Sequence, residues 1–148
     1  MFFLDIVTTV CIGLMVGTEF AVSVFIDPVL RKLDDVAQLN AIRIFAGRLG
    51  AAMPFWYALS LVLLIIEAVL RRSETGFALL LGSAGIWAAA IVLSVLFLVP
   101  INNRLARLSP NAPSGQALQE HERWDALHRV RVVVLGAAMV CFLFAIHV

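Results

Sequence analysis

Charged residues are scarce in this sequence and make up 14% of its 148 residues, whereas soluble proteins contain about 25%. Apolar residues make up 62% of the chain, and the mean hydropathy is +0.99. A soluble domain of this size has no room to hide so much apolar surface, because small domains bury a modest share of what the unfolded chain exposes. The composition therefore excludes a soluble enzyme and a disordered segment, and it indicates an integral membrane protein.

The sequence also lacks an excess of either charge, with 11 basic and 10 acidic residues. Without a basic excess to neutralise phosphates, we expect no nucleic-acid partner. The two cysteines, Cys11 and Cys141, are too few for a disulfide framework and lie in apolar runs. No two histidines are three or four residues apart, and no Cys/His cluster exists. We therefore expect no metal site built from adjacent ligands.

Four continuously apolar runs are long enough to cross a bilayer as helices, which takes roughly 20 residues each. They cover about residues 6–26, 51–70, 77–101 and 130–148. A transmembrane barrel would require alternation of apolar and polar residues instead. The predicted fold is all-α, a single membrane domain over residues 1–148 that forms an antiparallel up-and-down four-helix bundle.

The basic residues predict the orientation of this bundle. Nine of the 11 lie in the first and third connections or at their edges. The positive-inside rule then places these two connections in the cytoplasm and both termini outside, as in a bacterial inner-membrane protein. In the second connection, Glu67 stands four residues before Arg71, which favours a helical ion pair.

Both long connections contain helical patterns. Asp27-Pro28 resembles a helix N-cap followed by proline at the first helical position. Apolar residues at helical spacing follow as far as Ile44, so we expect an amphipathic helix along the cytoplasmic interface in the first connection. The segment Ser109–Gly115 is rich in loop-forming residues. From about Gln116 we expect a helix that runs unbroken into the fourth span.

Glu19 is the one charged residue deep within a predicted span. It lies seven residues before Ile26, or about 10 Å from the cytoplasmic end of its helix at 1.5 Å per residue. An ionised carboxylate at this depth is costly unless it is paired or hydrated. We therefore expect Glu19 to face the bundle interior or a cavity, as a functional group or as a structural carboxylate held by an arginine.

The segments on either side of the third connection carry the other candidates. Pro100 is expected to kink the end of the third span and free a carbonyl group, which Asn102 and Asn103 can satisfy unless they bind a ligand. Four residues beyond the connection share one helix face by their spacing: His121, Trp124, His128 and Arg131. Trp124 and Arg131 also fit an interfacial anchor. Asp125 is close enough in sequence to fix the tautomer of His128.

These candidates converge if odd spans run inward and even spans run outward. Glu19, the two asparagines and the polar face of the fourth helix then meet at the cytoplasmic boundary. Four-helix bundles build their sites from side chains on facing helices. The sequence therefore predicts one pocket that combines a carboxylate, an imidazole, a guanidinium and amides.

The string from Val99 to Leu105, followed by Trp124-x-x-Leu127-His128-x-x-Arg131, resembles the anthrone oxygenase-like membrane proteins. That family has about this length and four predicted spans. A Pro-x-Asn motif ends its third helix, and Trp, then Asn or His, then Arg open its fourth. The resemblance implies oxidation of a polyketide-type anthrone to an anthraquinone by O₂.

The resemblance assigns Asn103, Trp124, His128 and Arg131 to the motif, and Glu19 is added because of its depth in the first span. A base removes the acidic C–H proton of the anthrone, and the carbanion reacts directly with O₂, so that no metal is required for this step. The sequence leaves open whether the protein has a cofactor. We expect Glu19 or His128 to act as that base and Arg131 with Asn103 to stabilise the oxyanion. Trp124 is expected to stack on the hydrophobic aromatic substrate. The remaining predicted substrate-binding residues are Asn102 and His121.

Three other functions remain open from the sequence. A small proton-coupled transporter would use Glu19, although such transporters have short loops and polar groups near mid-membrane. A haem- or ligand-binding bundle would use His128 as an axial ligand. A structural subunit would need neither residue. Gly13-x-x-x-Gly17 offers a flat face for packing within the bundle or in a homo-oligomer.

Overall fold

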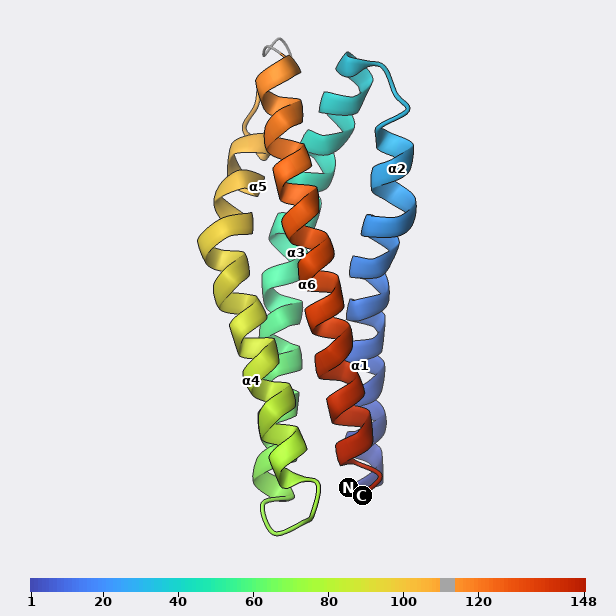
Figure 1. Ribbon diagram of the computed structural model, residues 1–148, viewed down its shortest axis with the longest axis vertical. Helices are drawn as coiled ribbons and strands as arrows, with labels where there is room; N and C mark the ends of the chain where they lie inside the picture. The colour runs from blue at the N-terminus through green and yellow to red at the C-terminus, as the bar shows by residue number, and fades with distance from the viewer. Residues whose placement is uncertain (110–113) are drawn as a thin grey trace.

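The computed structural model describes residues 1–109 and 114–148, and these residues are arranged as four long helical rods (Figure 1). The first rod consists of α1 (Phe2–Ala21), the π-helix η1 (Val22–Ile26) and α2 (Asp27–Leu30), and the second is α3 (Asp35–Leu70). The third consists of α4 (Phe77–Leu93), the π-helix η2 (Ser94–Leu98) and α5 (Val99–Ala106), and the fourth is α6 (Ser114–Ala145). No strand occurs in the described ranges.

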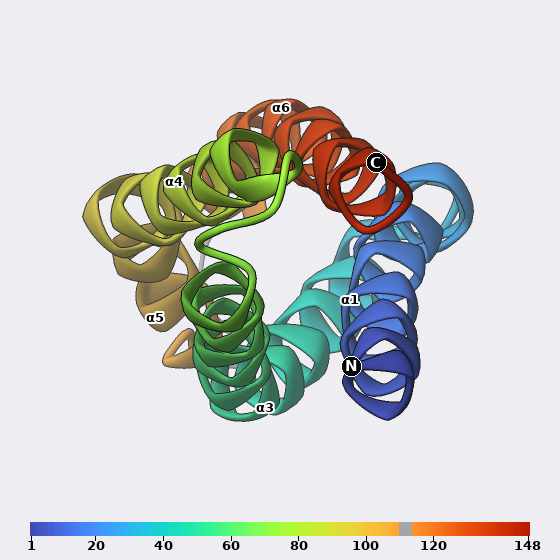
Figure 2. The ribbon, with the colours of Figure 1, turned by 90° about the horizontal axis from the view of Figure 1, so that it is seen from below.

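The rods form the predicted up-and-down bundle. Viewed along its axis, α1 lies between α3 and α6, and α4 lies between the same two helices on the other side (Figure 2). Both chain termini lie at one end of the bundle (Figure 1). All four rods are long and apolar enough to cross a membrane. The chain is therefore an integral membrane four-helix bundle, as the sequence predicted.

The bundle is filled by apolar side chains and is also covered by them. The main core includes Ile12, Met15, Leu64, Trp87 and Phe142, all fully buried. Many large apolar side chains on the outside of the bundle are more than half exposed. Such a surface is compatible with contact with lipid rather than with water. A Cβ atom at Gly13 would lie 3.5 Å from Met139 of α6, in ordinary van der Waals contact, and one at Gly17 would have no neighbour within 4 Å, so packing between these helices requires neither glycine.

The first connection differs from the prediction. No separate interfacial helix lies there. Asp27 is the first residue of α2 and not an N-cap, because α2 continues the first rod to Leu30. The real N-cap is Asp34, whose side chain accepts a hydrogen bond from the backbone N–H of Ala37. The predicted amphipathic segment lies mostly in the first part of α3. Ile42 and Ala46 of this part are buried in a second core cluster with Leu30, Ile101 and Leu105, whereas Val36 and Ile44 are exposed.

Rods one and three share a local irregularity that the sequence only partly indicated. In each, a five-residue π-helix is followed two residues later by a proline, Pro28 or Pro100. Proline has no N–H to donate within a helix and its ring crowds the preceding turn. A π-turn widens the helix at that point and is often found at functional sites. Both π-helices lie next to the cavity described below.

The fourth helix is confirmed as one unbroken rod that includes its polar segment. It ends at Ala145 rather than Val148. Residues 110–113 of the predicted loop lie outside the described residues, and α6 begins at Ser114.

At the end with the two termini, Arg71 gathers three carboxylates. Its nitrogen atoms lie 2.6 Å from Asp5, 3.0 Å from Glu74 and 3.3 Å from Glu67. The predicted pair of Glu67 and Arg71 is thus confirmed. Burial lowers the pKa of Arg71, but the hydrogen bond and charge of Asp5, followed by those of Glu74 and Glu67, raise it above its ordinary value overall. The charged guanidinium ties α1 to the end of α3.

Candidate functional site

Glu19 is the centre of a buried polar cluster formed by three helices. Its carboxylate comes from α1 and is 1% exposed. Arg131 of α6 donates from Nη2 to Oε2 over 2.7 Å, and the Tyr57 hydroxyl of α3 donates to Oε1 over 3.0 Å. His128 Nδ1 lies 3.1 Å from Oε2. A buried carboxylate needs an opposite charge and hydrogen-bond donors. Arg131, Tyr57 and His128 supply both to Glu19 within the bundle.

His128 has a partner for each ring nitrogen in either protonation state. Its Nε2 lies 3.2 Å from the Glu19 carbonyl oxygen, which accepts an N–H. Its Nδ1 lies 2.9 Å from Arg131 Nη2 and 3.1 Å from Glu19 Oε2. The neutral ring accepts from Arg131 at Nδ1, and the protonated ring donates to Glu19 at the same atom.

Trp124 lies between two histidines along α6. Its ring stacks on His128 with centroids 4.7 Å apart and on His121 with centroids 5.8 Å apart. The His128 ring covers one face of the indole, and the more distant His121 ring lies nearly parallel to the indole. The stacking of Trp124 on a substrate stays a prediction. The indole also packs against His128 and so helps to hold that ring beside Glu19.

A cavity of about 190 Å³ lies against this cluster. Its inner wall includes Glu19, Tyr57, Trp124, His128 and Arg131. The other lining residues are Val22 of the first rod and residues of α3 and the third rod, and the exposed ones among them are Gly50, Pro54, Ala58, Val95, Val99 and Asn103. These exposed residues belong to α3 and to the third rod, and all of them lie within the helices that are long and apolar enough to cross a membrane. The cavity therefore opens sideways, between α3 and the η2–α5 segment.

Arg131 is the most constrained side chain of the cavity wall. Its Nη1 donates to the Ser94 hydroxyl over 3.3 Å, and its Cζ lies 5.5 Å from the centroid of the Tyr57 ring. Its Nε is buried and has no hydrogen-bond partner among the described residues. A buried N–H without an acceptor is rare and requires an explanation. Because Nε is itself buried, an oxygen atom of a ligand in the cavity would reach it after a small shift of the guanidinium.

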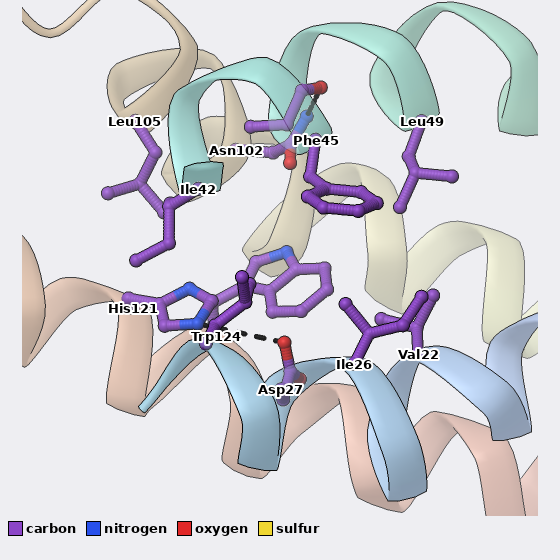
Figure 3. A pocket seen from close by; sticks show the side chains of 12 residues that line it. Val22, Ile26, Asp27, Ile42, Phe45, Leu49, Asn102, Leu105, His121 and Trp124 are labelled. Carbon is purple, nitrogen blue, oxygen red and sulfur yellow. Dashed lines mark hydrogen bonds and ion pairs between the residues drawn. The ribbon is translucent and has the colours of Figure 1, made fainter. Parts of the chain in front are cut away.

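The structure brings six of the seven predicted site residues to this cavity: Glu19, Asn102, Asn103, Trp124, His128 and Arg131. The Asn102 side chain donates to the Ala46 carbonyl oxygen over 2.9 Å and so also links α5 to α3. The seventh residue, His121, lies outside the cavity. It lines a smaller pocket with Asp27 and Asn102 (Figure 3).

Sequence analysis missed Tyr57 and Ser94, and it assigned Asp125 to the wrong partner. Tyr57 is the chain's one tyrosine, and its polar hydroxyl group within an apolar span could have identified it as a candidate site residue. Ser94 is held by its bond to the Ala90 carbonyl oxygen, a contact that no pattern predicts. Asp125 pairs with Arg31 at 2.5 Å and with Arg129, so it does not orient His128.

Among residues 1–109 and 114–148, no three His, Cys, Asp or Glu side chains are grouped so that they could hold a metal ion. Both ring nitrogens of His128 lie within hydrogen-bond distance of protein atoms. An axial bond from His128 to a haem iron would therefore break one of these contacts.

A family model described as anthrone oxygenase matches residues 41–141, which include the Pro-Ile-Asn-Asn string and the polar face of α6. No curated protein and no solved structure matches the chain. The family match covers more than half of the sequence and contains all of the candidate site except its α1 contribution, Glu19. The chain belongs to the anthrone oxygenase family.

Proposed function

We propose that this protein is a membrane-embedded oxygenase that converts a hydrophobic anthrone-type substrate to a quinone with O₂. The family match supports an oxygenase-like role in the membrane. The observation that carries the proposal further is the unpartnered Nε of Arg131 at the wall of the cavity. A donor fixed in this way suits an oxygen atom on which negative charge develops during the reaction.

The reaction needs a base and an electrostatic partner, both of which the cluster contains. The base takes one proton from the central methylene of the anthrone, and the negative charge spreads to the carbonyl oxygen, near Arg131. The carbanion gives its electrons to O₂ and a C–O bond forms, leaving a peroxide on that carbon. The base returns its proton to the outer peroxide oxygen and then takes the second C–H proton. The C–H electrons form the carbonyl as the O–O bond breaks, and the departing hydroxide takes the second proton from the base and leaves as water.

We assign the base to Glu19 and His128 acting together. Their side chains are 3.1 Å apart, and His128 Nδ1 accepts from Arg131 when it is unprotonated and donates to Glu19 when it is protonated. A proton accepted at the cavity wall is therefore shared within a buried pair, whose charge Arg131 balances. Proton transfer to a positioned group of this kind contributes about 10²–10⁴-fold to a rate.

The shape of the cavity fits a flat, hydrophobic molecule that enters from the bilayer. An apolar cavity of about 150 Å³ holds benzene, and this one is about 190 Å³ with a lateral opening. The reacting part of a three-ring substrate therefore occupies the interior while the remainder extends into the opening. Proton-coupled transport is less well supported, because Arg131 already pairs with Glu19 where a cationic cargo would bind.

The test is oxidation by the purified protein in detergent or lipid discs. With anthrone as the probe, we expect O₂ uptake and a quinone absorbance in equal amounts, with no added metal or cofactor. Glu19→Gln removes the charge that holds Arg131 and His128, so we expect the rate to fall at least about 100-fold. A parent protein that leaves anthrone and related phenols no more oxidised than buffer does would contradict the proposal.

Glu67→Gln is the matched control. Glu67 is another fully buried glutamate with an arginine partner, and it lies near the end of the bundle that holds the termini. We expect this variant to fold and to keep the parent rate. Equal losses in both variants would indicate damage to the bundle rather than to the site.

A further inference from the structure

A second, smaller pocket lies beside the cavity, between the first rod, α3, α5 and α6. Its volume is about 30 Å³, and most of its wall is apolar (Figure 3). It shares four lining residues with the cavity: Val22, Leu49, Asn102 and Trp124. The two spaces are therefore neighbours, and the Trp124 ring is part of the wall between them.

Two buried polar side chains face this pocket without full hydrogen bonding. Asp27 is 3% exposed and His121 is 5% exposed. His121 Nε2 lies 3.7 Å from Asp27 Oδ1, which is beyond hydrogen-bond distance (Figure 3). Both ring nitrogens of His121 have no hydrogen-bond partner in the described part of the chain, and Asp27 has only the neighbouring Asp125 carboxyl. Two unpartnered nitrogens beside one small pocket point to a bound polar molecule.

The surrounding charged groups leave His121 without a hydrogen-bond partner among the described residues, although Asp27 lies within hydrogen-bond reach of Asp125. Arg31, which follows α2, and Arg129 of α6 both bond to Asp125, which is 1% exposed. On the α3 and α5 sides the pocket wall is Ile42 and Leu105, with the amide of Asn102 already bonded to Ala46. Arg31 and Arg129 themselves have side chains that are 39% and 60% exposed. Asp27 and His121 therefore lie just beneath a polar surface.

Water is the ligand that fits. A bound water needs roughly 10–15 Å³ and two to four polar partners, and the pocket offers about 30 Å³ and the atoms of Asp27 and His121. No ring of a substrate fits in this volume. The size and the chemistry of the pocket thus agree on one small hydrogen-bonding molecule.

We propose that Asp27 and His121 form a water site through which the water made in the reaction leaves the cavity. This inference rests on the oxygenase function proposed above, since the reaction releases one water and no net proton. The cavity opens sideways toward lipid, where water is poorly accommodated. The neighbouring pocket lies between the cavity and the exposed arginines at the end of the bundle, and Asp27 and His121 offer hydrogen-bonding groups to a water molecule that moves between them. Asp27 and His121 are thus positioning residues that do not contact the anthrone.

Radical footprinting tests the site without relying on activity. A synchrotron X-ray pulse makes hydroxyl radicals from water in place, and these oxidise adjacent side chains, which mass spectrometry locates. Ile42 and Leu105, each 2% exposed, line the small pocket but not the cavity. We expect both to be labelled in the parent protein, while Leu80, which is fully buried in the main core, is not labelled.

Two variants remove the water in different ways. Ala46→Leu fills the pocket, which Ala46 lines, and His121→Phe keeps a ring but removes its polar atoms. We expect labelling of Ile42 to fall several-fold in both. We also expect kcat to fall about tenfold with KM for anthrone unchanged. Ala52→Leu, at an exposed position of the same helix, is the matched control and should resemble the parent.

The outcomes separate the two proposals. A parent protein in which Ile42 and Leu105 stay unlabelled, or variants that keep both labelling and kcat, would overturn the water site. Labelled residues in a parent protein that oxidises no anthrone would contradict the oxygenase function and leave the site itself supported.

Discussion

At the scale of single residues, the site depends on a guanidinium that makes several contacts at once. Arg131 bonds to Glu19 and Ser94, lies beside His128 and covers the Tyr57 ring. A lysine ammonium is a compact point charge without the planar fork that makes these contacts simultaneously. The type of cation, and not only its charge, therefore determines the arrangement of the cluster.

Arg131→Lys tests this dependence. The variant keeps the ion pair with Glu19 but loses the Nε donor, so we expect a folded protein whose oxidation rate is about 10²-fold lower, the usual cost of one lost oxyanion donor. Stopped-flow absorbance of the quinone measures the rate, and thermal unfolding in detergent measures the fold. A rate equal to that of the parent would show that Nε does not contact the reacting oxygen.

At the scale of helices, the upper part of α3 is held against α5 by a close approach at Gly50. A Cβ atom placed there would lie 2.5 Å from Asn102 Nδ2, the atom that donates to the Ala46 carbonyl oxygen. Gly47, one turn earlier on the same helix, has no neighbouring atom within 4 Å of such a Cβ. One glycine is thus required by packing between rods, whereas the other is not.

Gly50→Ala and Gly47→Ala form a matched pair. Each gains up to about 1 kcal/mol from the helix preference of alanine over glycine. Gly50→Ala also loses the Asn102 hydrogen bond, which is worth about 1 kcal/mol. We therefore expect the free energy of unfolding in detergent to rise for Gly47→Ala and to stay level or fall for Gly50→Ala. An equal gain in both variants would refute the close approach at Gly50.

At the scale of the whole molecule, the bundle has two chemically different ends and an apolar middle. The end with both termini is held by the acidic residues around Arg71. The other end carries most of the basic residues, among them Arg31 and Arg129. This asymmetry is the basis for placing the basic end, and with it the candidate cavity and water site, on the cytoplasmic side.

Cysteine labelling tests that orientation. Ser73→Cys and Lys32→Cys place a thiol at exposed positions on opposite ends of the bundle. In intact bacteria, we expect a membrane-impermeant maleimide to label the first variant and to label the second only after the cells are opened. The native cysteines lie within spans and provide the background in the parent protein. The reverse pattern would place the termini in the cytoplasm.

The sequence by itself determined that this protein lies in a membrane and how many helices cross it. Apolar runs of membrane length allow only helices or a closed barrel, and continuous runs leave the helices. It also identified Glu19, His128 and Arg131, because a charge inside an apolar span requires a partner. Local sequence patterns were less informative at the first connection. Asp27-Pro28 resembled the start of a separate helix, but the first rod continues through the π-helix to Leu30.

Only the tertiary structure decided which polar groups meet. Tyr57 bonds to Glu19 from another helix, Asp125 bonds to arginines rather than to His128, and His121 faces Asp27 in a separate pocket. Such pairings depend on how helices rotate about their axes and cross, and that rotation is set by packing across all four rods. A residue's position along one helix indicates its depth in the membrane but does not identify its partner across the bundle.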